Sequence, residues 1–117
     1  SFTVLNDMIA AIGEGYFGLE RREASSAGNV TTFFRIKRTY KGGPVRIMQV
    51  LGGPGGWRYE PLGVTAQFHA LRHIGADVEK AGLCFAEKTS CCRRCHSPLT
   101  NTVSSSRGYG PDCIKLI

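Results

Sequence analysis

The sequence predicts an α+β fold: a small antiparallel meander of three strands with flanking helices and a C-terminal zinc finger resembling a treble clef. Three stretches rich in strand-forming residues predict the sheet, and turn-forming residues separate them: 15–23, 30–40 and 45–51. The finger is predicted by the stretch 91–113, which holds four of the five cysteines. Neighbouring strands with short connections pair most simply in the antiparallel sense.

Two helices are expected around this meander. Apolar residues recur every three or four positions over 3–12, which predicts one amphipathic helix. A longer helix is expected from Thr65 to about residue 88. Gly75 and Gly82 weaken the longer helix, so we expect it to bend or break near one of them.

At 117 residues the chain is expected to form one compact unit. Its parts are the N-terminal helix with the β-meander (1–63), a connecting helix (64–88) and a zinc-finger module (89–117). No apolar run approaches the ~20 residues of a membrane span. An odd number of cysteines clustered at one end favours metal ligation in a reducing compartment over disulfides, so we expect a cytoplasmic protein.

The cysteine-rich stretch has the spacing of a metal site. Cys92 and Cys95 form a CxxC turn, in which two thiolates can reach one ion. Cys113 is the third expected ligand, because Pro111 before it suits the first turn of a helix. Zn²⁺ is the expected metal, since it prefers four ligands rich in sulfur. A redox CxxC is the rival interpretation, but such motifs belong to a βαβ context that is absent here.

The fourth ligand remains open at the level of sequence. Cys84 is favoured, because it lies near the end of the helix that leads into the CxxC turn. Cys91 and His96 are the alternatives, although both adjoin other ligands. His69 and His73 stand four residues apart on one helical face, but two surface histidines are the simpler interpretation. A water molecule or a partner's ligand could also fill the position.

The segment after the CxxC resembles a known pattern. The residues that carry it are Pro98, Leu99, Thr100, Ser104, Gly108, Gly110, Pro111 and Cys113. This spacing is similar to an uncharacterised zinc-finger domain that is common in actinobacterial phages and their hosts. The resemblance implies a zinc site and a phage-type origin, with action in the host cytoplasm, but no activity. The chain departs from the pattern at His96-Ser97, where the family has Gly-Arg, and in its additional Cys84 and Cys91.

Positive charge is concentrated in one part of the chain. The net charge is +6, and no acidic residue occurs between Ala24 and Tyr59. Such a region suits a polyanion, although a solvated strand face that only confers solubility is the plainer alternative. The six cations of this region are Arg35, Lys37, Arg38, Lys41, Arg46 and Arg58.

These features predict a small, non-enzymatic, zinc-binding accessory protein that binds nucleic acid. Phe33, Arg35 and Lys37 alternate onto one strand face, which interleaves an aromatic ring with cations. The alternative function is a phage inhibitor that docks the same basic face on an acidic host protein of the transcription or defence machinery. An enzyme is not expected, because the sequence lacks a recognisable triad, an HExxH motif and a P-loop.

Overall fold

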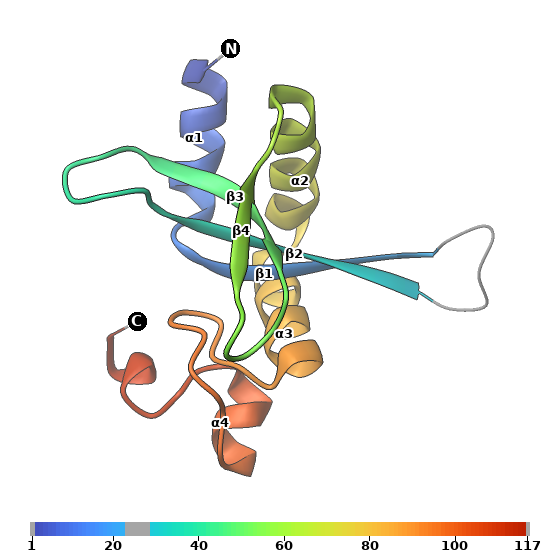
Figure 1. The fold of residues 1–117 in the computed structure, drawn as a ribbon, viewed down its shortest axis with the longest axis vertical. Helices are drawn as coiled ribbons and strands as arrows, with labels where there is room; N and C mark the ends of the chain where they lie inside the picture. The colour runs from blue at the N-terminus through green and yellow to red at the C-terminus, as the bar shows by residue number, and fades with distance from the viewer. Residues whose placement is uncertain (1, 23–28, 117) are drawn as a thin grey trace.

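The computed structural model describes residues 2–22 and 29–116, and it shows an α+β fold (Figure 1). Within these residues no helix is long and apolar enough to cross a membrane. The elements in chain order are α1 (Phe2–Ile12), β1 (Gly15–Arg22), β2 (Asn29–Arg38), β3 (Val45–Leu51), β4 (Arg58–Pro61), α2 (Val64–Ala76), α3 (Val78–Thr89), α4 (Thr102–Arg107) and the 3₁₀ helix η1 (Cys113–Leu116).

The sheet has four antiparallel strands in the order β1-β2-β3-β4, one more than the sequence predicted. The additional strand, β4, pairs with β3 and places Tyr59 opposite Val50. Strand β4 has only four residues and ends in a proline, so it is too short to show the alternation of apolar and polar residues typical of a strand. Only its pairing with β3 reveals it. The three predicted strands are present, and β3 has the predicted bounds.

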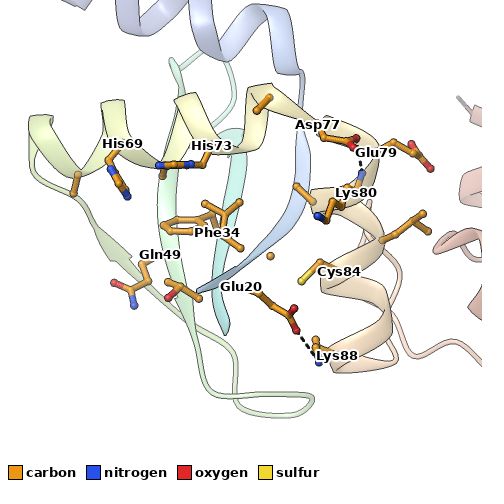
Figure 2. Close-up of a pocket in the computed structure, with 18 of the residues that line it drawn as sticks. Glu20, Phe34, Gln49, His69, His73, Asp77, Glu79, Lys80, Cys84 and Lys88 are labelled. Atoms are coloured by element: carbon orange, nitrogen blue, oxygen red, sulfur yellow. Dashed lines mark hydrogen bonds and ion pairs between the residues drawn. The ribbon is translucent and has the colours of Figure 1, made fainter. Parts of the chain in front are cut away.

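The single helix expected over 64–88 is two helices that meet at Asp77. Asp77 has an extended backbone (φ −157°, ψ 87°), and its side chain accepts a hydrogen bond of 3.1 Å from the backbone N–H of Lys80 (Figure 2). The aspartate thus caps the start of α3. The break follows Gly75 by two residues, whereas Gly82 lies inside α3. The N-cap of α2 is Gly63, whereas the sequence predicted Thr65. No side chain forms a capping hydrogen bond at this helix start.

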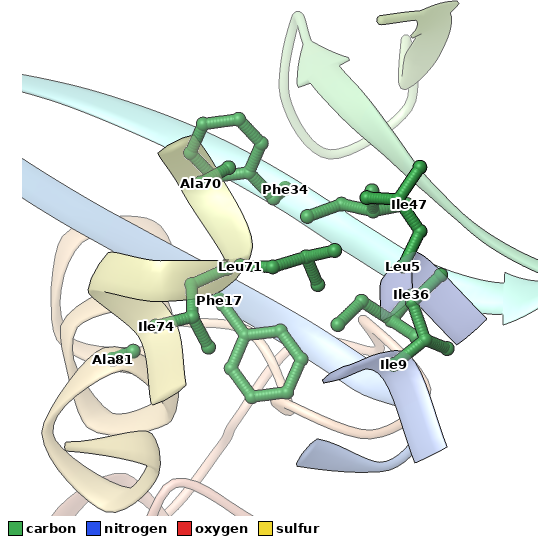
Figure 3. Close-up of a cluster of buried hydrophobic side chains, with 10 residues drawn as sticks. All are labelled: Leu5, Ile9, Phe17, Phe34, Ile36, Ile47, Ala70, Leu71, Ile74 and Ala81. Atoms are coloured by element: carbon green, nitrogen blue, oxygen red, sulfur yellow. The ribbon is translucent and has the colours of Figure 1, made fainter. Parts of the chain in front are cut away.

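Helices α1 and α2 cover one face of the sheet and enclose the larger core (Figures 1 and 3). Phe34 and Ile36 of β2 point into it, as their alternation predicts. Leu5 of α1 and Leu71 of α2 meet them from the helical side. The buried members of this cluster are Leu5, Ile9, Phe17, Phe34, Ile36, Ile47, Ala70, Leu71, Ile74 and Ala81.

Helix α3 packs along the edge strand β1 and joins the two faces of the sheet. Its Ala81 belongs to the larger core, whereas Phe85 belongs to a second cluster with Tyr16 and Val50. Gly18 of β1 permits this approach, because a Cβ there would lie 3.2 Å from the backbone nitrogen of Phe85. Alternation along β1 and β3 places Tyr16 and Val50 on the face opposite α1 and α2.

The C-terminal segment is fixed to this framework by Arg93, which is only 5% exposed. Its guanidinium lies across Gly82 of α3 and forms a 2.8 Å ion pair with Glu79. The carbonyl of Arg93 accepts a 2.7 Å hydrogen bond from Tyr16, and its N–H donates one of 2.8 Å to Gly108. One residue therefore links α3, the edge of the sheet and the cysteine-rich segment.

The two helical glycines are expected to respond to alanine with opposite signs. Gly75→Ala should raise the free energy of unfolding by about 0.5–1 kcal/mol, because its nearest neighbours lie 3.8 Å away and alanine favours helix. Gly82→Ala should lower it by about 1–3 kcal/mol, because a Cβ there would overlap the Arg93 guanidinium. Urea unfolding of both variants measures the difference. Equal stabilisation by both would contradict the packing of Arg93 over α3.

Candidate metal centre

The structure brings together the three cysteines predicted as ligands. The Sγ atoms of Cys92, Cys95 and Cys113 all lie within 4.8 Å of one another. Tetrahedral Zn–S bonds of about 2.3 Å would hold the sulfurs about 3.8 Å apart, so a small closure would place all three around one ion. Cys92 and Cys113 are buried and Cys95 is half-buried. The cluster can therefore hold a metal ion with little access to solvent.

The CxxC turn has hydrogen bonds that favour thiolate ligands. The N–H of His96 donates to the carbonyl of Cys92 at 2.8 Å and closes the turn. The N–H of Arg94 lies 3.4 Å from the Cys92 sulfur, and the N–H of Gly110 reaches the same sulfur at the same distance. Backbone donors of this kind stabilise negative charge on sulfur. His96 adopts a left-handed backbone conformation, with φ 58°.

A short helix, which the sequence analysis did not predict, returns the chain to the cluster. Helix α4 begins at Asn101, whose side chain accepts a 2.8 Å hydrogen bond from the N–H of Ser104. It ends at Gly108, whose φ of 78° favours glycine. The helix expected around Cys113 is the single 3₁₀ turn η1, and the N–H of Ile114 bonds to Gly110 at 3.0 Å.

The pKa values of two of these thiols, Cys95 and Cys113, move in opposite directions. Burial raises the pKa of Cys95, but hydrogen bonds from the side chain and backbone of Ser97 outweigh burial and lower the pKa to about 7. Burial raises the pKa of Cys113 to about 11, and its hydrogen bond to Cys95 adds to this effect. The guanidinium of Arg94 lies 3.8 Å from the Cys113 sulfur and partly offsets the rise. Cys95 is thus more acidic than Cys113, and metal binding would release the proton of the Cys113 thiol.

The candidates for a fourth ligand lie elsewhere. Cys84 is in α3, where its sulfur would lie 2.9 Å from a Cβ at Gly18. Cys91 is fully buried, and its thiol donates to the carbonyl of Thr89 at 3.4 Å. The ring of His96 packs against aromatic residues of the sheet rather than on the sulfurs. Among the described residues, no fourth Cys, His, Asp or Glu joins the cluster.

Cys84 and the paired histidines face a different feature, an open groove of about 1650 Å³ between α2, α3 and the sheet (Figure 2). The rings of His69 and His73 stand 4.4 Å apart, and both side chains are exposed. Burial, followed by the nearby charge of Glu20, raises the pKa of Cys84. Lys88 forms a 2.8 Å ion pair with Glu20 across the groove. Within the described chain, these side chains do not form a three-donor metal site.

The aromatic residue predicted for the basic strand face, Phe33, is half-buried. The ring of Phe33 packs edge-on against Phe85, with 5.6 Å between centroids. Arg35 lies on the same face, and its guanidinium carbon is 3.7 Å from the centre of the Tyr59 ring. Phe33 therefore supports the second cluster, and Tyr59 and Arg35 form the surface beside it.

The six predicted cations do not share one face. Lys37 and Arg46 are both exposed and stand directly opposite each other on β2 and β3. Arg38 and Arg58 alternate to the other face, and Lys41 lies in the turn that joins β2 to β3. The strongest concentration of charge is consequently the β2–β3 hairpin, not the whole region from Ala24 to Tyr59.

The comparison with protein families gives a partial match. Residues 85–117 match DUF6011, a family of unknown function. The matched segment starts at Phe85 in α3 and includes Arg93 and the three clustered cysteines, whereas the four-stranded sheet lies outside it. A search of the curated proteins found no match, and a search of the solved structures found none either.

Serine variants of the cysteines should separate ligands from packing residues. Cys113→Ser should lose bound metal, because it removes one of three clustered donors. Cys84→Ser should retain it, since Cys84 lies against Gly18 in the groove. Metal content by native mass spectrometry checks both variants. Retention by the Cys113 variant together with loss by the Cys84 variant would reverse the assignment.

The left-handed conformation of His96 predicts a difference between two substitutions that both remove its ring. His96→Gly should be more stable than His96→Ala by about 1–2 kcal/mol, because glycine adopts φ 58° without strain. Denaturant unfolding at saturating metal gives the comparison. An alanine variant as stable as the glycine variant would show that the turn does not require this conformation.

Proposed function

We propose that this chain is a zinc-binding, non-enzymatic accessory protein that binds nucleic acid through the β2–β3 hairpin. The observation that carries the proposal is the direct opposition of Lys37 and Arg46 on neighbouring strands. Zinc has a structural role in this proposal, and the hairpin supplies the contact with the polyanion.

Zinc is supported as the metal by the chemistry of the donors. Three clustered sulfurs suit a soft or borderline ion, and Zn²⁺ is the usual occupant of such sites. The CxxC turn and the later Cys113 have the plan of a treble-clef finger. When bound, zinc would cross-link the turn at Cys92 to η1, and its binding free energy would stabilise the folded segment.

The β2–β3 hairpin has an excess of positive charge that its own structure does not neutralise. Like charges directly opposite on antiparallel strands destabilise the pair. Among the described residues, neither Lys37 nor Arg46 forms an ion pair, and no acidic residue occurs from Ala24 to Tyr59. A phosphate backbone would relieve this repulsion, which supports a nucleic acid as the partner.

The shape of the hairpin supports the same partner. Its turn projects beyond α1 at the side of the molecule (Figure 1). Tyr40 in this turn is 68% exposed, and Lys41 follows it. An exposed aromatic ring among cations is typical of surfaces that bind nucleic acid. The resemblance of the cysteine segment to a phage-type domain further supports a role in an infected host cell.

The charge of the hairpin should control binding. Fluorescence anisotropy with a labelled oligonucleotide should show affinity that falls steeply as salt rises, because binding releases counterions. The double variant Lys37→Ala/Arg46→Ala should weaken binding about tenfold or more at low salt and reduce the slope against log salt by about two.

The control for charge is Arg72→Ala/Lys80→Ala, which removes two exposed cations from α2 and α3. It should leave the affinity within about threefold of the parent. The absence of binding to DNA and RNA at low salt would reject this function. A host protein captured by the parent after nuclease treatment, and lost with Lys37→Ala/Arg46→Ala, would then favour an acidic protein as the partner.

A further inference from the structure

We infer that the rings of Trp57 and His96, where the sheet meets the cysteine-rich segment, form a stacking site for an unpaired nucleobase. The partner would then be single-stranded where it crosses the sheet. This inference rests on the proposed function and specifies the class of nucleic acid. Phe33 lies on the same face, and its ring packs edge-on against Phe85, the residue that also supports Trp57.

The two rings of this site are half-buried and held from beneath. Trp57 and His96 are 6.0 Å apart between centroids, at an interplanar angle of 64°. Phe85, which is fully buried, supports Trp57 at 5.9 Å, and the buried Tyr16 supports His96 at 5.3 Å. Rings that the core already orders lose little freedom when a base stacks on them.

The site continues toward the basic hairpin through Tyr59 and Arg35. The hydroxyl groups of Tyr59 and Tyr16 are 3.0 Å apart, which fixes the Tyr59 ring beside the site. The planar guanidinium of Arg35 lies against that ring at 3.7 Å. Arginine planes and aromatic rings are the usual stacking partners of exposed bases.

Charge and stacking occur on the same face of the sheet. Arg35 and Lys37 are two residues apart on β2, and Arg46 stands opposite Lys37. A strand whose phosphates contact Lys37 and Arg46 would therefore direct its bases toward Trp57. A duplex keeps its base faces stacked inside the helix, so these half-buried rings can accept only a base outside a duplex.

The site also depends on the metal-binding segment. His96 belongs to the CxxC turn, and the buried Arg93 docks that turn on α3 and β1. Loss of this docking would remove the His96 ring from the site. Lys37 and Arg46 lie on the sheet, so they would stay in place. Stacking of a base on the two rings should therefore depend on the docking of the cysteine-rich segment. The contacts of Lys37 and Arg46 with phosphate should depend on the salt concentration.

Trp57 is the only tryptophan of the chain, so its fluorescence reports on the site directly. Titration with an oligothymidylate of about 12 nucleotides should quench this fluorescence. A duplex of equal length should bind about tenfold more weakly at the same salt and leave the emission nearly unchanged. Anisotropy of labelled strands measures both affinities independently of the tryptophan.

Variants separate this inference from the proposed function. Trp57→Leu should lower the affinity for the single strand about tenfold, leave the duplex unaffected and be largely rescued by Trp57→Tyr. Lys37→Ala/Arg46→Ala should weaken both ligands. Failure of both ligands to bind would reject the proposed function together with the inference. Equal affinity for the single strand and the duplex, without quenching of the Trp57 fluorescence, would reject the stacking site alone. If Trp57→Leu fails to fold, quenching in the unsubstituted protein is the test of the stacking site.

Discussion

The arrangement of this protein depends on the burial of Arg93 across Gly82. A guanidinium that is 5% exposed is tolerated because Glu79, itself 68% exposed, neutralises it at the surface of α3, and the centre of the Tyr109 ring lies 4.9 Å from it. The backbone of the same residue bonds to Tyr16 and Gly108. The position of the cysteine cluster relative to the sheet is therefore set by one side chain and its two backbone groups. Any residue larger than glycine at position 82 would compete for that space.

The features that local chemistry determines were predictable from the sequence. Three strands and the N-terminal helix follow from hydrophobic periodicity, and β3 has the predicted bounds. The clustering of Cys92, Cys95 and Cys113 follows from the reach of a CxxC turn and a glycine-proline return. Each of these features depends on residues that are near one another in the chain or on a turn that their own composition favours.

The features that long-range packing determines were not predictable. Strand β4 exists because β3 offers an unpaired edge, and Cys84 faces a groove because α3 lies along β1. The alternation of β2 placed Phe33 correctly beside Arg35, but only the position of Phe85 shows that the Phe33 ring packs edge-on against the second cluster and is half-buried. Arg93, the first residue between the two cysteines of the CxxC turn, carries no signal in the sequence, since an arginine normally faces solvent. Its role becomes visible only with Gly82.

The left-handed backbone of His96 is balanced by the aromatic contacts of its ring. A non-glycine residue at φ 58° costs about 1–2 kcal/mol. Edge contacts with Tyr16 and Trp57 are two aromatic pairs of about 0.5–1.5 kcal/mol each, so together they can offset that cost. The ring nevertheless remains half-exposed instead of completing the core. The conformation of the CxxC turn is therefore coupled to the packing of the His96 ring on Tyr16 and Trp57, and these contacts account for it without residual strain.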